Sequence, residues 1–142
     1  MNDLRLVIGN KNYSSWSMCP WLLLKMFDVD FEEIQITLYQ DDTAEKLGPY
    51  SPSLKVPVLL HREITVWDSF AICEYISEQF INDSAWPASP KRRASARSTS
   101  AEIHSEFPHL KKEWPLNCKA SYKLKPSPQV LDEIARIDAV WS

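Results

Sequence analysis

Strand-like and helix-like segments alternate through the first 81 residues in an order that few folds can accommodate. The branched apolar run from Leu4 to Ile8 precedes Gly9, which is typical of a buried strand that enters a loop. Short apolar or alternating runs predict three further strands, and apolar residues spaced by three and four predict helices. The predicted strands are 4–8, 31–37, 56–60 and 64–67, and the predicted helices are 14–27, 43–47 and 68–80.

This order determines how the strands can pair. The first two strands are joined through a helix, so we expect them to be parallel, with a right-handed crossover. The last two are separated only by the turn at 61–63 and should form an antiparallel hairpin. A mixed four-stranded sheet with helices on both faces follows, which is an α/β fold.

The composition changes after the last of these helices. A polar, proline-containing stretch predicts a linker at 82–89, between a domain at 1–81 and an all-α region at 90–142. Ser89-Pro90 is a helix start, and that helix should continue to about Phe107. A second helix begins near Pro128, and its apolar pattern continues up to Ser142. We therefore expect only part of a helical domain. Its apolar stripe comprises Val130, Leu131, Ile134, Ile137, Val140 and Trp141.

Composition argues against several functions. The 142 residues carry a net charge of −3, which gives no indication of nucleic-acid or anionic-lipid binding. The longest apolar run, Trp21 to Leu24, is far too short for a membrane span, and the N-terminus lacks the layout of a signal peptide. We therefore expect a cytoplasmic protein with neither nucleic acid nor membrane as a partner.

The cysteines, histidines and glycines point to no metal or nucleotide site. Cys19, Cys73 and Cys118 are widely spaced, form no Cys-x-x-Cys pair and have no histidine at metal-ligand spacing. Gly9 and Gly48 are the only glycines, which excludes a glycine-rich phosphate loop. We therefore expect neither a bound metal nor a disulfide framework.

Three motifs follow one another at a characteristic spacing. They read LVIGNKNYSSWS at 6–17, SPSLKVPVL at 51–59 and WDSFAICEYI at 67–76. Together they resemble the glutathione-binding domain of the glutathione S-transferases, closest to bacterial members with a zeta-like serine motif. A weaker similarity runs from Trp86-Pro87 through 101–105, so the resemblance covers nearly the whole chain.

The resemblance implies a fold, an activity and partners. The fold would be a thioredoxin-like N-terminal domain of βαβαββα order, followed by part of the all-α C-terminal domain. The activity would be that of a glutathione S-transferase in detoxification, which activates the glutathione thiol for conjugation to a small electrophile or for its isomerisation. The partners would be glutathione, a hydrophobic electrophile and a second copy of the chain in a homodimer.

Ser14 and Ser15 are the candidate catalytic residues. A free thiol with a pKa near 8.5 is mostly protonated at neutral pH, and a hydroxyl at a helix start would favour the thiolate. From the pattern alone these serines, with Ser17, would be read as helix caps. The resemblance instead assigns Ser14 as the thiolate-stabilising hydroxyl, with Ser15 supporting it, while capping remains the better interpretation of Ser17.

Two further segments are candidates for binding glutathione. The resemblance implies that the Val56-Pro57 bond is cis and that the Val56 backbone pairs with the cysteinyl unit; the plain alternative is a proline at a strand start. Lys55 either approaches a glutathione carboxylate or is simply solvated. Asp68 and Ser69 open a helix that suits the γ-glutamyl carboxylate and ammonium, although Asp68 also serves as an ordinary cap.

Several positions leave alternatives open. Leu54 stands where the family usually has glycine, which predicts an altered turn, and Cys19 stands where it usually has arginine. Trp16, His104 and Phe107 are candidates for lining the electrophile pocket, although such residues are commonly plain core. The rival functions are a non-catalytic binding or assembly module and a thiol-disulfide oxidoreductase that uses Cys19.

Overall fold

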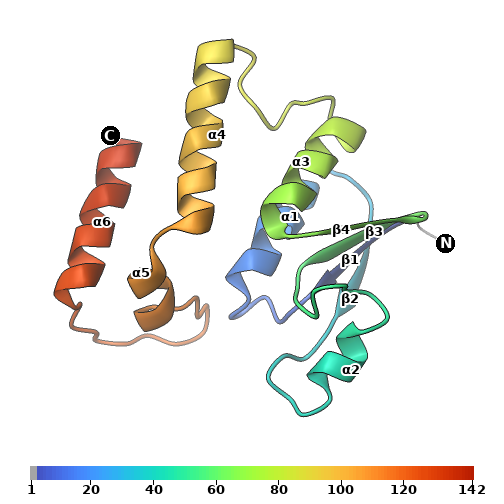
Figure 1. The fold of residues 1–142 in the computed structure, drawn as a ribbon, viewed down its shortest axis with the longest axis horizontal. Coiled ribbons are helices and arrows are strands. Elements are labelled where there is room, and N and C mark those ends of the chain that lie inside the picture. Colours follow the sequence, from blue (N-terminus) through green and yellow to red (C-terminus); the bar gives the residue numbers. More distant parts are fainter. Residues whose placement is uncertain (1–2) are drawn as a thin grey trace. The chain divides into compact units, whose positions relative to one another are not determined.

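The computed structural model describes residues 3–142, which divide into two compact units (Figure 1). The first unit ends at Trp86 and the second is Pro87–Ser142. Among the described residues, no helix has both the length and the apolar character that a membrane crossing requires.

The first unit has the predicted order of strands and helices. Its elements are β1 (Leu4–Ile8), α1 (Ser15–Met26), β2 (Glu32–Gln35), α2 (Thr43–Leu47), β3 (Val58–His61), β4 (Ile64–Trp67) and α3 (Ser69–Phe80). The sheet order is β2-β1-β3-β4; β1 and β2 are parallel, and the other two pairs are antiparallel. The prediction of a mixed four-stranded α/β sheet is therefore confirmed.

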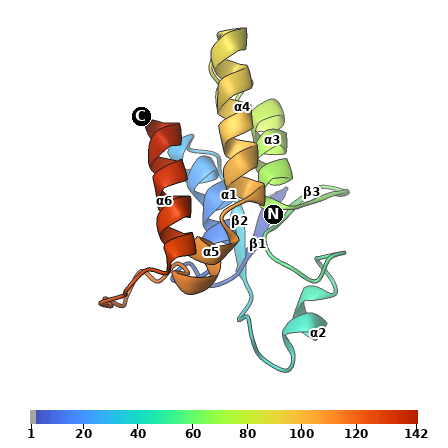
Figure 2. The same cartoon turned by 60° about the vertical axis from the view of Figure 1, so that its left-hand side comes forward.

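Alternate residues of the strands face two separate cores. Leu6 of β1 and Leu59 of β3 pack with Ile72 of α3 in the core on the α1 and α3 side of the sheet. Val7 and Val58, the neighbours of those strand residues, pack on the opposite face with Leu47 of α2 and others. Figures 1 and 2 both show α1 and α3 together, with α2 apart from them. The period of two in the sequence thus produces the two covered faces.

The register brings three loops to one edge of the sheet. Val58, the first residue of β3, lies opposite Val7 near the end of β1 and opposite Trp67 at the end of β4. The loop after β1, the segment before β3 and the start of α3 after β4 therefore emerge at the same edge.

Some local features of the first unit differ from the predictions. Pro20 lies inside α1, where it has no N–H to donate to the carbonyl four residues earlier. β2 covers only Glu32–Gln35 rather than 31–37, and only one of its four residues is even partly buried. The hairpin turn consists of Arg62 and Glu63, because His61 still belongs to β3.

Leu54 adopts the backbone conformation that glycine would adopt at its position. Its φ is 54°, in the left-handed region, and it is 50% exposed. The turn predicted to be altered is therefore left-handed, with a leucine in a conformation that disfavours a side chain.

Replacing Leu54 with glycine should stabilise the first unit. We expect the free energy of unfolding to rise by about 1 kcal/mol, since a left-handed conformation costs a non-glycine residue about that much and little packing is lost at an exposed position. Urea denaturation measures the change. As a control, Leu131→Gly at a similarly exposed helical position should lower stability by about 1 kcal/mol; a loss of stability on Leu54→Gly would refute the strain argument.

The second unit contains three helices. They are α4 (Pro90–Ser105), α5 (Pro108–Glu113) and α6 (Pro128–Trp141). The short helix α5 was not predicted; it follows Phe107, which has a φ of 65°. Glu102 of α4 accepts two hydrogen bonds from the Arg136 guanidinium of α6, at 2.5 and 2.8 Å, and the two helices lie side by side (Figure 2).

A glutamate on α6 ties this helix to α5. The Glu133 carboxylate accepts from the backbone N–H groups of His109 (3.1 Å) and Leu110 (2.7 Å). The predicted apolar stripe of α6 is only partly covered, because Val130 is buried while Leu131 and Trp141 are 52% and 75% exposed.

Candidate functional site

The loop after β1 is shaped by Asn10. Its carbonyl oxygen accepts from the backbone N–H groups of Tyr13 (3.1 Å) and Ser14 (2.9 Å), and its side-chain oxygen accepts from that of Asn12 (2.8 Å). These bonds turn the chain sharply and leave Ser14 at the N-cap position of α1.

The Ser14 hydroxyl does not cap the helix. It makes no side-chain cap hydrogen bond and lies 2.8 Å from the Ser17 hydroxyl oxygen, which accepts from the backbone N–H of Gly9 at 3.1 Å. A Cβ on Gly9 would stand 2.6 Å from Cδ1 of Leu38 and 3.0 Å from both Cβ and Oγ of Ser14, so a larger residue at position 9 would crowd the Ser14 side chain. Helix capping therefore does not explain the Ser14 and Ser17 side chains.

Ser15 and Cys19 lie on the outer side of α1. Ser15 is exposed, and its carbonyl oxygen accepts from the Cys19 thiol at 3.6 Å. Although Cys19 is exposed as a residue, burial around its sulfur raises the pKa of the thiol above the ordinary value, and the backbone hydrogen bond offsets this only in part. A thiol-disulfide oxidoreductase needs the opposite shift, so the surroundings of Cys19 disfavour that alternative.

The segment before β3 is held by a buried serine. Ser51 is 2% exposed; its hydroxyl donates to the Lys55 carbonyl oxygen (2.8 Å) and accepts from the Lys55 N–H (3.1 Å). The next bond, Val56-Pro57, is cis, as the resemblance implies. Outside the helices and strands, the backbone hydrogen bonds among residues 3–142 do not use the N–H or C=O of Val56. Val56 thus offers a donor and an acceptor at the sheet edge.

Ser51→Ala should weaken both this segment and ligand binding. We expect the free energy of unfolding to fall by about 1–3 kcal/mol, because the Lys55 backbone groups lose their partner. Glutathione affinity should fall as well, since Val56 follows directly. Urea denaturation and calorimetric titration measure the two effects. Ser53→Ala is the matched control, because within residues 3–142 the only hydrogen bond of the Ser53 side chain is to the Ser51 hydroxyl, at 3.3 Å. Equal effects of the two substitutions would contradict this role of Ser51.

Asp68 and Ser69 open α3 at the same edge. The Asp68 carboxylate accepts from the Phe70 N–H at 2.9 Å, so the capping role is present. Its φ of 75° lies in the region that favours glycine, which holds the chain in a sharp turn out of β4. Ser69 is 4% exposed, and its hydroxyl has no hydrogen-bond partner within the described part of the chain.

The architecture thus brings the loops carrying three predicted groups to one edge: Ser14, the Val56-Pro57 pair and the Asp68-Ser69 pair. Lys55 directly precedes the cis bond. The roles assigned to these residues stay predictions. So do those of Trp16, which belongs to the first unit, and of His104 and Phe107, which belong to the second.

Comparison with known proteins indicates the family of the first unit. Residues 13–79 match the family model described as "Glutathione S-transferase, N-terminal domain". The chain contains the N-terminal domain of the glutathione S-transferase family. Its curated relatives include a probable maleylacetoacetate isomerase of Caenorhabditis elegans, which is 32% identical over 97 residues. That match covers 66% of this chain and 45% of the relative, and the chain spans less than half of the length of the first curated relatives it matches.

Solved glutathione transferases share the fold. A glutathione transferase homologue from Burkholderia, solved with bound glutathione, is 30% identical; the match has a TM-score of 0.65 and covers 78% of this chain and 60% of the homologue. A theta-class enzyme from Xanthomonas axonopodis pv. citri was also solved with glutathione. Its match has a TM-score of 0.72 and covers 98% of this chain and 70% of the enzyme. At 19% identity, this second likeness concerns the fold alone.

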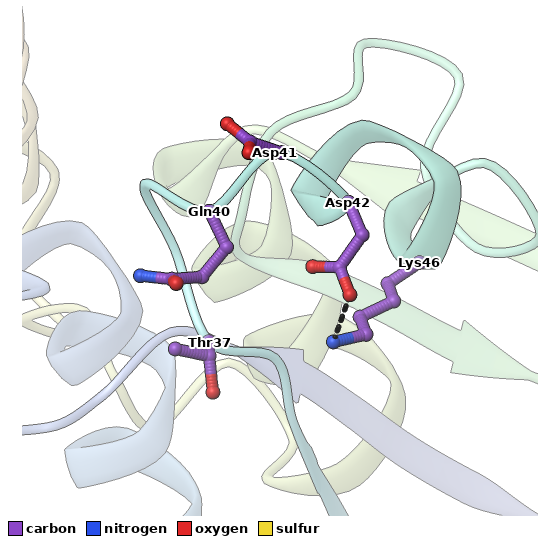
Figure 3. A pocket seen from close by; sticks show the side chains of 5 residues that line it. All are labelled: Thr37, Gln40, Asp41, Asp42 and Lys46. Carbon is purple, nitrogen blue, oxygen red and sulfur yellow. Dashed lines mark ion pairs between the residues drawn. The ribbon is translucent and has the colours of Figure 1, made fainter.

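A separate pocket lies on the connection between β2 and α2. Figure 3 shows its five lining residues, among which the Asp42 carboxylate pairs with the Lys46 ammonium at 2.7 Å. The lining residues are Thr37, Gln40, Asp41, Asp42 and Lys46. None of them was predicted as a site residue. Within residues 3–142, no group of three or more His, Cys, Asp or Glu side chains is placed to hold a metal ion.

Sequence reasoning missed two roles at the edge. The sequence pattern places Ser51 in the second motif without indicating a role for it, and it favours a capping role for Ser17. The spacing of Ser14 and Ser17 was the available signal for the second, because residues three apart lie on one face of a helix. Nothing in the sequence pattern links Ser17 to Gly9 across the turn.

Proposed function

We propose that this protein binds glutathione and activates its thiol for attack on a small electrophile. The observation that carries the proposal is the Ser14 hydroxyl, which is not used to cap its helix and stands at the sheet edge that also bears the cis Val56-Pro57 bond. The match to the N-terminal domain of the glutathione S-transferase family supports glutathione as the ligand.

Each residue at the edge has a distinct part in the proposed complex. The Val56 N–H and C=O pair with the cysteinyl unit of glutathione as an added strand would. The Ser69 hydroxyl at the start of α3 takes the γ-glutamyl carboxylate, while Asp68 takes the adjacent ammonium. Lys55 is positioned in sequence to approach a second carboxylate of the tripeptide.

The chemistry follows from stabilising an anion. The Ser14 hydroxyl donates a hydrogen bond to the sulfur, which lowers the pKa of the thiol, and the thiol proton leaves to solvent. The thiolate then supplies the electron pair for a new carbon–sulfur bond with the electrophile; with a chlorodinitrobenzene-type electrophile the carbon–chlorine bond breaks and chloride leaves with its electron pair. A shift of one pKa unit needs about 1.4 kcal/mol, which one charge-assisted hydrogen bond provides.

We further propose the type of reaction and the oligomeric state. Conjugation is the general case, and isomerisation with glutathione as cofactor is suggested by the name of the maleylacetoacetate isomerase relative. We also propose a homodimer. Turnover of a chlorodinitrobenzene-type electrophile tests conjugation, and glutathione binding without turnover would favour the non-catalytic module.

Calorimetric titration tests the binding proposal directly. The chain is titrated with glutathione at neutral pH in two buffers of different ionisation enthalpy, which reveals proton release. S-methylglutathione is the matched control, because it keeps both carboxylates and the ammonium but has no thiol proton. We expect both ligands to bind and only glutathione to release a proton; no binding at millimolar glutathione would reject the proposal.

A further inference from the structure

Ser17 is the most deeply buried polar residue next to the proposed thiolate site. It is 0% exposed, and its hydroxyl oxygen contacts two groups, the Gly9 N–H at 3.1 Å and the Ser14 hydroxyl oxygen at 2.8 Å. Ser14 is 9% exposed. The three groups form a short chain that starts at the backbone at the end of β1.

The direction of the hydrogen bond between the two serines follows from burial. A serine hydroxyl has one hydrogen to donate and lone pairs that accept. The Ser17 oxygen accepts from Gly9, and within residues 3–142 the only acceptor recorded for the Ser17 hydrogen is the Ser14 oxygen. If Ser14 donated instead, a fully buried hydroxyl hydrogen would have no partner, which costs about 1–3 kcal/mol. The satisfied arrangement has Ser17 as the donor.

We infer that Ser17 is a positioning residue, which donates its hydrogen to Ser14 and thereby directs the Ser14 hydrogen outward to the glutathione sulfur. This inference rests on the proposed function. The bonds then run in one direction, from the Gly9 N–H to Ser17, from Ser17 to Ser14, and from Ser14 to the thiolate. Hydrogen bonds in such a chain polarise one another, so that Ser14 becomes a stronger donor. No proton is transferred between the groups of this hydrogen-bonded chain.

Gly9 contacts both serines. The Gly9 N–H anchors Ser17, while a Cβ at Gly9 would stand only 3.0 Å from the Ser14 oxygen. The end of β1 thus holds both serines against one backbone segment. Ser17 itself does not touch the ligand, and it acts on the sulfur only through Ser14.

The test measures the pKa of the bound glutathione thiol by the ultraviolet absorbance of the thiolate. It uses the parent chain, Ser14→Ala, Ser17→Ala and the double variant. We expect Ser17→Ala to raise this pKa by about 0.5–1 unit, a ~3–10-fold loss of thiolate at neutral pH. Affinity for S-methylglutathione should hardly change. In the Ser14→Ala background, Ser17→Ala should add no further shift, because its effect passes through Ser14.

Ser77→Ala is the matched control. Ser77 is also 0% exposed, but its hydroxyl has no hydrogen-bond partner in the described part of the chain, so its removal should leave the thiol pKa unchanged. If Ser17→Ala does not fold, Ser17→Cys replaces it, since its S–H is a weaker donor and should give a smaller shift in the same direction.

The outcomes separate this inference from the proposed function. A parent chain that does not bind glutathione, or does not lower its thiol pKa, overturns the proposed function and this inference with it. A parent that lowers the pKa equally with and without the Ser17 hydroxyl overturns this inference alone. So does an effect of Ser17→Ala that persists in full in the Ser14→Ala background, or one matched by an equal loss of S-methylglutathione affinity.

Discussion

Ser14→Ala is expected to slow glutathione conjugation by about 10–100-fold at neutral pH, because a hydrogen bond to a charged group is worth about 1.5–3 kcal/mol. The loss concerns the thiolate, so it should depend on pH. The variant's rate should keep rising towards the pKa of the free thiol, near 8.5, whereas the rate of the parent should level off at lower pH. A pH–rate profile with a chlorodinitrobenzene-type electrophile measures both effects.

Ser15→Ala is the comparison that separates the two candidate catalytic serines. Ser15 is the first residue of α1 and is exposed, while Ser14 is buried against Gly9 and Ser17. We expect Ser15→Ala to change the rate by less than about fivefold, since a supporting exposed hydroxyl contributes under about 1 kcal/mol. A pH–rate profile of Ser14→Ala that coincides with that of the parent would remove Ser14 from the mechanism. A larger loss of rate in Ser15→Ala than in Ser14→Ala would assign the thiolate-stabilising role to Ser15 instead.

Local patterns were sufficient to predict the architecture of the first unit. Leu6 and Val7 are neighbours in sequence yet belong to opposite cores, and the same alternation recurs at Val58 and Leu59 in β3. Because the side-chain period of a strand is two, such runs indicate two covered faces without knowledge of the partners. The helix between the first two strands and the short turn between the last two then restricted how these strands could pair.

The details that shape the site depend on contacts that no local pattern contains. The Gly9–Ser17 bond spans eight residues and requires the turn built by Asn10. Leu54 takes a left-handed conformation although leucine disfavours it, because the hydrogen bonds around Ser51 determine the backbone there. Tertiary context overrode local preference at both places, and both border the proposed site.

The short helix α5 escaped prediction for a different reason. Six residues are too few to show a helical period, and Phe107 before it has a positive φ that its side chain does not favour. The bonds from Glu133 to the N–H groups of His109 and Leu110 supply the missing stabilisation, from 23 and 24 residues away. A helix stabilised from such a distance cannot be recognised from its own residues.

Leu59→Ala should be the most destabilising of the substitutions considered for the first unit. Leu59 is 0% exposed, lies opposite Leu6 in the ladder and packs in the core with Ile72 and Ile76 of α3. Truncating such a leucine removes buried apolar surface and leaves a cavity, which costs about 2–5 kcal/mol. Urea denaturation should show a lower midpoint for the first unit, and a change below about 1 kcal/mol would contradict the central place of Leu59 in this core.

Glutathione distinguishes a core role of Leu59 from a role in the site. Leu22→Ala, at a 45% exposed position of α1, is the control, with an expected change within about 0.5 kcal/mol. A ligand that binds only the folded chain stabilises it according to its concentration and dissociation constant. If Leu59 serves only the core, saturating glutathione stabilises parent and variant equally, and the gap between their free energies of unfolding is unchanged. Leu59 lies only two residues beyond Pro57, so a gap that widens with glutathione would mean that the substitution has also loosened the Val56-Pro57 segment and weakened binding.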